Sequence, residues 1–368
     1  MPPPPNLTAV KSQGRSMKYT ALAIPAALAM LASASPAAAG AIAANTSPIT
    51  FDAGFGKISV DGQLTGLAFY QTNATHLLPG DSETYLDLDN AMIEVSKTDG
   101  FFQFYVAAGL YAFPTVGFPY DKATDQNSYL GPVPVAYAKL QLTDTFSISA
   151  GKLPTLVGAE LAFTPQNSNI ERGLLWFQEP ITSRGVQANY ASGPLSIAVS
   201  WNDGYYTNVW NTGSALISYT IDSSNTLAFD ASVTPDYGSA SGNQIYDLMY
   251  TYSADPWTVG PYVQYQSVNH GGGSEWGAGV LASYQLTPEW SLNGRAEYED
   301  SDNSGALFVY GPGSKAWSFT VTPTYQKGIF FARGELSYTS LQDNAIGFGK
   351  AFNKDNQFRA LFETGISF

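Results

Sequence analysis

Cysteine is absent from this 368-residue chain, and histidine occurs only twice, as His76 and His270. Without thiols the chain has neither a disulfide framework nor a thiolate metal site, and we expect no metal and no cofactor. Charged residues make up only 13% of the chain, against about 25% in soluble domains. Basic residues are the scarcest, with 17 Lys and Arg against 30 Asp and Glu. This balance excludes the basic stripe of a nucleic-acid-binding protein.

Long apolar runs are also missing, with one short exception near the start. Residues 18–34 are apolar and rich in alanine, follow two basic residues, and precede the small-residue site Ala37-Ala38-Ala39. This pattern predicts a secretory signal peptide over residues 1–39, cleaved near Gly40. A single membrane anchor is the alternative, and Met1 and Met17 are alternative starts. The segment carries three basic and no acidic residues, so its removal changes the net charge from −13 to −16.

Beyond this segment the chain lacks a run of roughly 20 apolar residues that could form a spanning helix, and alternation takes its place. In 314–326, for example, nearly all odd positions are apolar or aromatic, whereas the even positions are mostly Ser and Thr. Such a polar face would be unfavourable in the apolar core of a β-sandwich. It is expected in a membrane barrel, where the apolar face contacts lipid and the polar face contacts water. The pattern predicts strands at 58–70, 83–97, 100–112, 133–143, 145–153, 183–191, 194–203, 212–221, 224–234, 243–253, 256–268, 274–287, 289–300, 314–326, 328–340 and 355–368.

The connections between these strands alternate in length. Seven are tight turns, and eight are longer, the longest being 154–182. Short periplasmic turns and longer extracellular loops are typical of outer-membrane barrels. In hydrocarbon a sheet is stable only if it closes on itself. We therefore expect an all-β, transmembrane, antiparallel up-and-down β-barrel of about 16 strands over residues 57–368, preceded by a short periplasmic lead-in at 40–56.

The 154–182 connection is the first candidate functional element, because loops of this length are usually functional. One interpretation is that it folds into the barrel and constricts the pore, since its apolar residues need burial. The alternative is an external cap over the barrel mouth. The candidate constriction residues in it and at its flanks are Lys152, Glu160, Glu171, Arg172, Glu179 and Arg184.

The inward faces of the last strands provide a second set of candidates. These charged side chains are Arg295, Glu297, Arg333, Glu335, Arg359 and Glu363. They either bias permeation by charge or form inter-strand ion pairs with little effect on selectivity, and both interpretations stay open. The negative net charge favours a slight cation preference.

Residues 151–190 carry a more specific pattern. The pieces are Gly151-Lys152-Leu153-Pro154-Thr155, then Gly158 and Glu160, then Asn169 to Leu175, and finally Glu179-Pro180 and Thr182 to Val186. This stretch of about 40 residues resembles the OmpL-like β-barrel porin-2 family of Gram-negative outer membranes. The resemblance implies a porin-like barrel with poorly defined substrates. Terminal Phe368, with Ile366 on the same face, also looks like the signature that outer-membrane assembly machinery recognises.

These observations favour an outer-membrane porin that lets small hydrophilic solutes or ions diffuse passively. Its expected partners are outer-membrane lipid, the permeating solutes or ions and the outer-membrane assembly machinery, but no nucleic acid. A homotrimer is left open. A structural or adhesion barrel with a closed lumen is one alternative. An enzyme acting on lipid is a remote second, because the chain has no G-x-S-x-G motif and its His residues lie in loops. A soluble secreted β-sandwich is the third.

Overall fold

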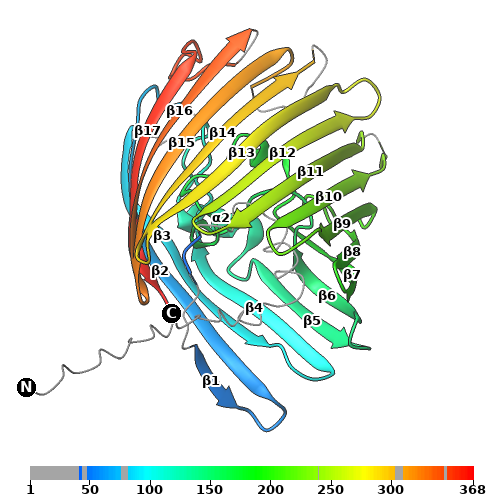
Figure 1. Ribbon diagram of the computed structural model, residues 1–368. Coiled ribbons are helices and arrows are strands. Elements are labelled where there is room, and N and C mark those ends of the chain that lie inside the picture. The colour runs from blue at the N-terminus through cyan, green and yellow to red at the C-terminus, as the bar shows by residue number, and fades with distance from the viewer. Residues whose placement is uncertain (1–40, 44–47, 76–81, 239, 303–309, 344–345) are drawn as a thin grey trace, which may run out of the picture.

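The computed structural model describes residues 41–43, 48–75, 82–238, 240–302, 310–343 and 346–368. The predicted signal peptide and His76 lie outside these residues. Sixteen antiparallel strands, β2 to β17, form one barrel (Figure 1). Their bounds are β2 Lys57–Gln71, β3 Thr84–Lys97, β4 Phe102–Tyr111, β5 Val135–Gln141, β6 Phe146–Pro154, β7 Thr182–Ser192, β8 Leu195–Asn202, β9 Thr212–Thr220, β10 Asn225–Thr234, β11 Asn243–Ala254, β12 Trp257–Val268, β13 Ser274–Thr287, β14 Trp290–Ser301, β15 Ser314–Lys327, β16 Phe330–Asp343 and β17 Asn356–Ser367.

The barrel closes where the last strand meets the first. β17 pairs with β2 in a register that runs from Arg359 opposite Gln71 to Ser367 opposite Gln63. All sixteen predicted strands are present, and no end differs from its predicted position by more than three residues. The predicted fold class is confirmed.

The two faces of the wall differ as the alternation predicts. In β15, Trp317 is 41% exposed on the outside, whereas the next residue, Ser318, is fully buried on the inside. Aromatic pairs gather at both ends of the outer surface, Trp257 with Tyr284 beside the short turns and Trp276 with Tyr298 beside the longer loops. Amphipathic rings prefer such positions at membrane interfaces.

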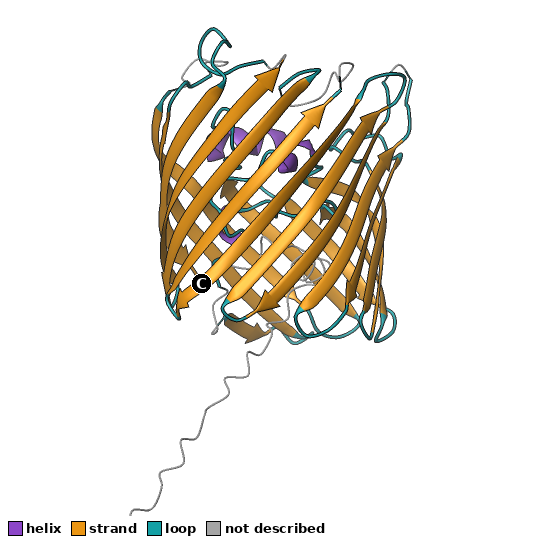
Figure 2. Ribbon diagram, turned by 45° about the horizontal axis from the view of Figure 1, so that its top comes forward, coloured by secondary structure: helices purple, strands orange, loops and turns teal. Residues whose placement is uncertain are grey.

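Among the described residues, four short elements lie outside the predicted strands. β1 (Ile49–Asp52) pairs with the first residues of β2. α2 (Ala123–Leu130) lies in the β4–β5 connection, and the 3₁₀ turns η2 (Thr164–Gln166) and η3 (Leu175–Gln178) lie between β6 and β7. Figure 2 shows helical turns enclosed by the strands. No helix in the described ranges is long and apolar enough to cross a membrane.

Candidate functional site: the barrel lumen and its internal segment

The β6–β7 connection, residues 155–181, lies inside the barrel, and we call it the internal segment. Most of its residues are buried. Its Leu156, Ala159, Leu161 and Leu175 pack against inward side chains of β8 to β13. Its Phe163 and Trp176 pack against inward side chains of the opposite wall, on β3 to β6. Because burying apolar surface is favourable, these contacts hold the segment inside rather than over the mouth. Constriction of a passage by the segment stays a prediction.

Three arginines on the inward faces of β14, β16 and β17 form buried ion pairs. Arg295 Nη1 lies 2.7 Å from Glu160 Oε1, and Arg359 Nη1 lies 2.6 Å from Glu171 Oε1. These two pairs join the wall to the internal segment. The third, Arg333 Nε to Glu363 Oε2 at 2.6 Å, joins β16 to β17. We call the inward faces of β14 to β17 that carry these groups the ion-paired wall.

The same wall also binds the backbone of the internal segment. Arg333 donates to the carbonyl oxygens of Thr164 and Asn167 at 2.7 and 2.8 Å. In the opposite direction, Glu335 accepts from the N–H groups of Ile170 and Glu171 at 2.5 and 2.8 Å. Buried charges are tolerated when they are paired and hydrogen-bonded. The charges of this wall therefore attach the internal segment firmly.

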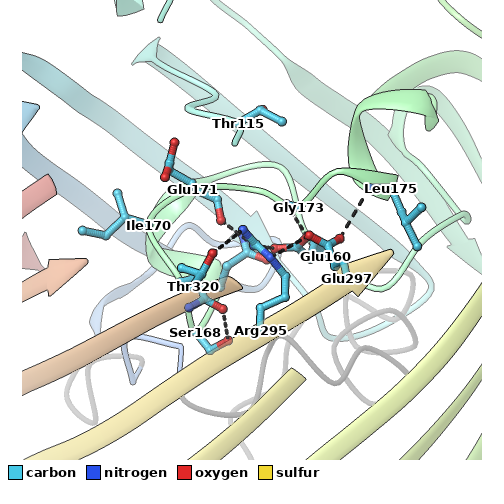
Figure 3. A network of polar contacts seen from close by, with 12 residues as sticks. Thr115, Glu160, Ser168, Ile170, Glu171, Gly173, Leu175, Arg295, Glu297 and Thr320 are labelled. Atoms are coloured by element: carbon cyan, nitrogen blue, oxygen red, sulfur yellow. Dashed lines mark hydrogen bonds and ion pairs between the residues drawn. The ribbon is translucent and has the colours of Figure 1, made fainter. Parts of the chain in front are cut away.

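Glu297 on β14 shows how closely the segment approaches the wall. Its carboxylate accepts the N–H of Leu174 at 2.9 Å and lies 3.1 Å from Arg295 Nε. Gly173 lies directly against this carboxylate, so a Cβ at that position would clash with it. The Gly173 N–H donates to Glu160 Oε2 at 2.6 Å. Figure 3 shows Arg295 between Glu160, Glu297 and Thr320, with Gly173 and Leu175 beside them.

Arg172 differs from the other three arginines. Its side chain is fully buried, and its guanidinium has no hydrogen-bond partner in the described part of the chain. The guanidinium lies 5.8 Å from the centre of the Trp176 ring. Its backbone is paired, because the Arg172 N–H donates to the Pro114 oxygen and its oxygen accepts from Val116. Arg172 thus joins the internal segment to the β4–β5 connection.

Lys152 and Arg184, at the flanks, lie away from this network. Arg184 Nη2 lies 2.6 Å from Asp203 Oδ2, and its guanidinium stacks 3.9 Å above the Tyr206 ring. Lys152 donates to the carbonyl oxygens of Leu130 and Val133. The structure therefore places both residues where they tie neighbouring connections together.

Sequence reasoning missed a second set of charges, on the wall formed by β10 to β14. These residues are Asp230, Asp247, Glu275 and Glu299, all buried and inward-facing. Glu179 of the internal segment joins them, because its carboxylate accepts from Gln264 on the same wall at 3.0 Å. We call these five carboxyl groups the acidic wall. The alternating pattern contained the signal, since each strand residue occupies a polar position of its strand.

The first described residues, 41–43, also reach the lumen. Ile42 is buried, and its N–H donates to the oxygen of Pro165 in the internal segment at 2.9 Å. The backbone of Ala43 is held on both sides by the Gln326 amide. Ala41 and Ala43 help line a cavity of about 930 Å³ among the β11–β15 ends that carry the short turns. Residues 41–43, which belong to the predicted lead-in, therefore lie at the barrel mouth.

The candidate assembly residues lie at the barrel seam. Phe368 exchanges two backbone hydrogen bonds with Gly62, at 2.8 and 2.9 Å, and its ring occupies the space that a Cβ on Gly62 would need. Ile366 pairs with Leu64 and Phe330. Recognition of these residues by assembly machinery stays a prediction.

His270, the candidate of the enzyme alternative, lies in the β12–β13 loop. Its Nε2 is 2.6 Å from Asp236 Oδ2 of the β10–β11 loop. The pKa of Asp236 is lowered to about 2, mainly by the hydrogen bond from the Gly242 N–H and then by Asn269 and His270. Within the described ranges, no group of three or more His, Asp or Glu side chains is placed to hold a metal ion.

Comparison with solved structures shows that porins and other outer-membrane proteins have a similar fold. The anion-selective porin from Comamonas acidovorans is 12% identical, with 84% of this chain and 99% of that chain covered and a TM-score of 0.63. Salmonella typhi OmpF, in complex with daunomycin, is 12% identical, with coverages of 87% and 100% and a TM-score of 0.60. OmpT of Vibrio cholerae, an outer-membrane protein, is 11% identical, with coverages of 88% and 100% and a TM-score of 0.58. At these identities the likeness concerns the fold.

No curated protein matches the chain at a significant level. A family model does match, over residues 57–368, which is the whole barrel. It is the family described as Putative beta-barrel porin-2, OmpL-like, the one that the 151–190 stretch resembles. The chain belongs to this family of porin-like outer-membrane barrels.

Proposed function

We propose that the protein lets small hydrophilic solutes or ions diffuse passively across the outer membrane. The observation that supports this most directly is the polarity of the lumen. Inward side chains such as Ser318, Thr320 and Thr322 are polar along the length of the strand, while their neighbours on the outside are apolar. A sixteen-strand barrel is too wide for side chains from the wall alone to fill, so water can occupy the remaining space. The internal segment would set the width.

Planar-bilayer recording with the purified, processed barrel tests this function. We expect discrete conductance steps in KCl, because a water-filled lumen carries ions. A variant with Phe177 replaced by Ala, which removes an exposed ring from the internal segment, should give larger steps. Silent bilayers after confirmed insertion of the folded protein would contradict the proposal.

A barrel with a closed lumen and a structural or adhesion role is the second candidate. It is favoured by the apolar contacts of the internal segment with both walls, through Leu175 on one side and Trp176 on the other. The same recording distinguishes the two, because a closed barrel inserts without conducting. Membership of a porin family favours the open channel over this role and over a lipid-acting enzyme.

Three further properties belong to the proposal. Cleavage near Gly40 is checked by sequencing the amino terminus of the exported protein. Recognition of Phe368 by the assembly machinery predicts slower assembly after its deletion. A homotrimer is supported by the trimer form of Vibrio cholerae OmpT, 10% identical, with coverages of 84% and 99% and a TM-score of 0.56, and native mass spectrometry tests it.

A further inference from the structure

We infer that the passage selects cations, and that the acidic wall, rather than the arginine pairs, determines this selectivity. The inference rests on the proposed function and adds the charge class of the solute. It is argued from three observations on β10 to β14 and the end of the internal segment: the strand register, the missing cationic partners and the unpaired oxygens.

The strand register places carboxylates side by side. Asp230 lies directly opposite Asp247, and the same row continues through Gln264 and Gly277 to Glu299. Neighbouring strands are about 4.8 Å apart, and like charges directly opposite each other destabilise a sheet. A position that costs stability in this way is consistent with a role in function.

The acidic wall has no cationic partner. The ion pairs found within the described ranges include none of its five carboxyl groups. The hydrogen bonds that these groups do receive come from neutral donors, such as the Gly158 N–H to Asp230 at 3.1 Å and the Gln264 amide to Glu179 at 3.0 Å. No basic side chain among the described residues therefore compensates these five carboxyl groups.

Unpaired oxygens at the same wall indicate what is missing. Among the described residues, one buried oxygen in each of Asp230, Glu179 and Glu299 accepts no hydrogen bond. Gln266, a neutral side chain 5% exposed and directly opposite Glu275, also has an unpaired amide oxygen. All of these atoms are acceptors. A passing cation, or the water that hydrates it, supplies the positive charge and the donors that they lack.

The ion-paired wall should contribute less to this selectivity, because its arginines lie beside its carboxylates. There each arginine has a carboxylate at 2.6–2.7 Å, so the fields of the two charges largely cancel at a distance. An excess of carboxylates on one side of a lumen favours cations. The similar porin from Comamonas acidovorans is anion-selective, but at 12% identity its side chains say nothing about this lumen.

Reversal potentials in a KCl gradient test the inference. We expect a higher permeability for K⁺ than for Cl⁻ in the unmodified barrel. The variant D230N/D247N keeps side-chain shape and the acceptor for Gly158, and its K⁺/Cl⁻ permeability ratio should fall several-fold. The matched control D144N/D222N removes two charges from exposed short turns and should leave the ratio unchanged.

A second variant, E275Q/E299Q, should lower the ratio in the same direction, and it serves if D230N/D247N does not fold. Folding is checked for each variant by heat-modifiable migration on gels. A conducting barrel without cation preference, or a ratio unaffected by both lumen variants, would overturn the inference while leaving the proposed function intact. A barrel that does not conduct would overturn both.

Discussion

The two walls of the lumen differ in whether their buried carboxyl groups have basic partners. On the ion-paired wall, Arg295 and Arg359 each meet a glutamate of the internal segment. On the acidic wall, Asp230 meets Asp247, and neither has a basic partner among the described residues. The internal segment is therefore attached by ion pairs on one side, whereas the buried carboxyl groups on the other side lack such partners. Stability and selectivity should therefore respond to mutations on different walls.

The largest effect is expected from breaking one buried ion pair. Arg333→Gln leaves Glu363 buried without its cation and removes the bonds to Thr164 and Asn167. Removing one partner of such a pair typically costs about 3–5 kcal/mol. We expect the free energy of unfolding, measured by urea titration in lipid vesicles, to fall by this amount. The double variant R333Q/E363Q should recover part of the loss, and no recovery would show that the charge pair is not the cause.

A smaller loss is expected from crowding the contact between the ion-paired wall and the internal segment. In Gly173→Ala the new Cβ meets the Glu297 carboxylate, which must move away from the N–H of Leu174. Overpacking of this kind costs about 1–3 kcal/mol, measured by the same titration. Gly294→Ala on β14 is the control, because the nearest atom, the Thr320 oxygen, lies 3.5 Å from the added Cβ. Equal losses in the two variants would contradict the steric explanation.

The acidic wall should respond with the opposite sign. Asp247→Asn removes one of two carboxylates that lie directly opposite each other, so the unfolding free energy should rise by about 0.2–1 kcal/mol. Asp222→Asn on a short turn provides the comparison and should give no such gain. If Asp247→Asn destabilised the barrel as strongly as Arg333→Gln, the distinction between the two walls would be wrong.

The smallest effect concerns the extracellular loops, away from both walls. The lowered pKa of Asp236 means that its contacts stabilise the folded loops above its ordinary pKa of 3.8, and that this contribution is lost as the pH falls through about 2. NMR titration of the carboxyl carbon measures this value. In His270→Ala we expect only a small rise in the pKa, since the Gly242 N–H is the main cause. A return to the ordinary value in that variant would instead assign the main effect to His270.

The sequence predicted the strand bounds well, but it predicted fewer of the contacts inside the lumen. β13 was predicted at its observed bounds, because apolar residues occupy every even position from Trp276 to Leu286 between clear turns. α2 was missed, since eight residues in a long connection carry too weak a periodicity. Of the candidate residues, Glu160 and Arg295 are brought together although 135 positions separate them. Lys152 and Arg184 instead contact other connections.

The sequence by itself determined the barrel, because a period of two fixes which side chains face lipid, and hydrocarbon admits a sheet only when it is closed. It also determined the family, through local motifs between Gly151 and Tyr190. Only the tertiary structure decided which charges meet. Strand register and the path of the internal segment set Arg359 against Glu171 and Asp230 against Asp247, and both depend on contacts between residues that are distant in the chain.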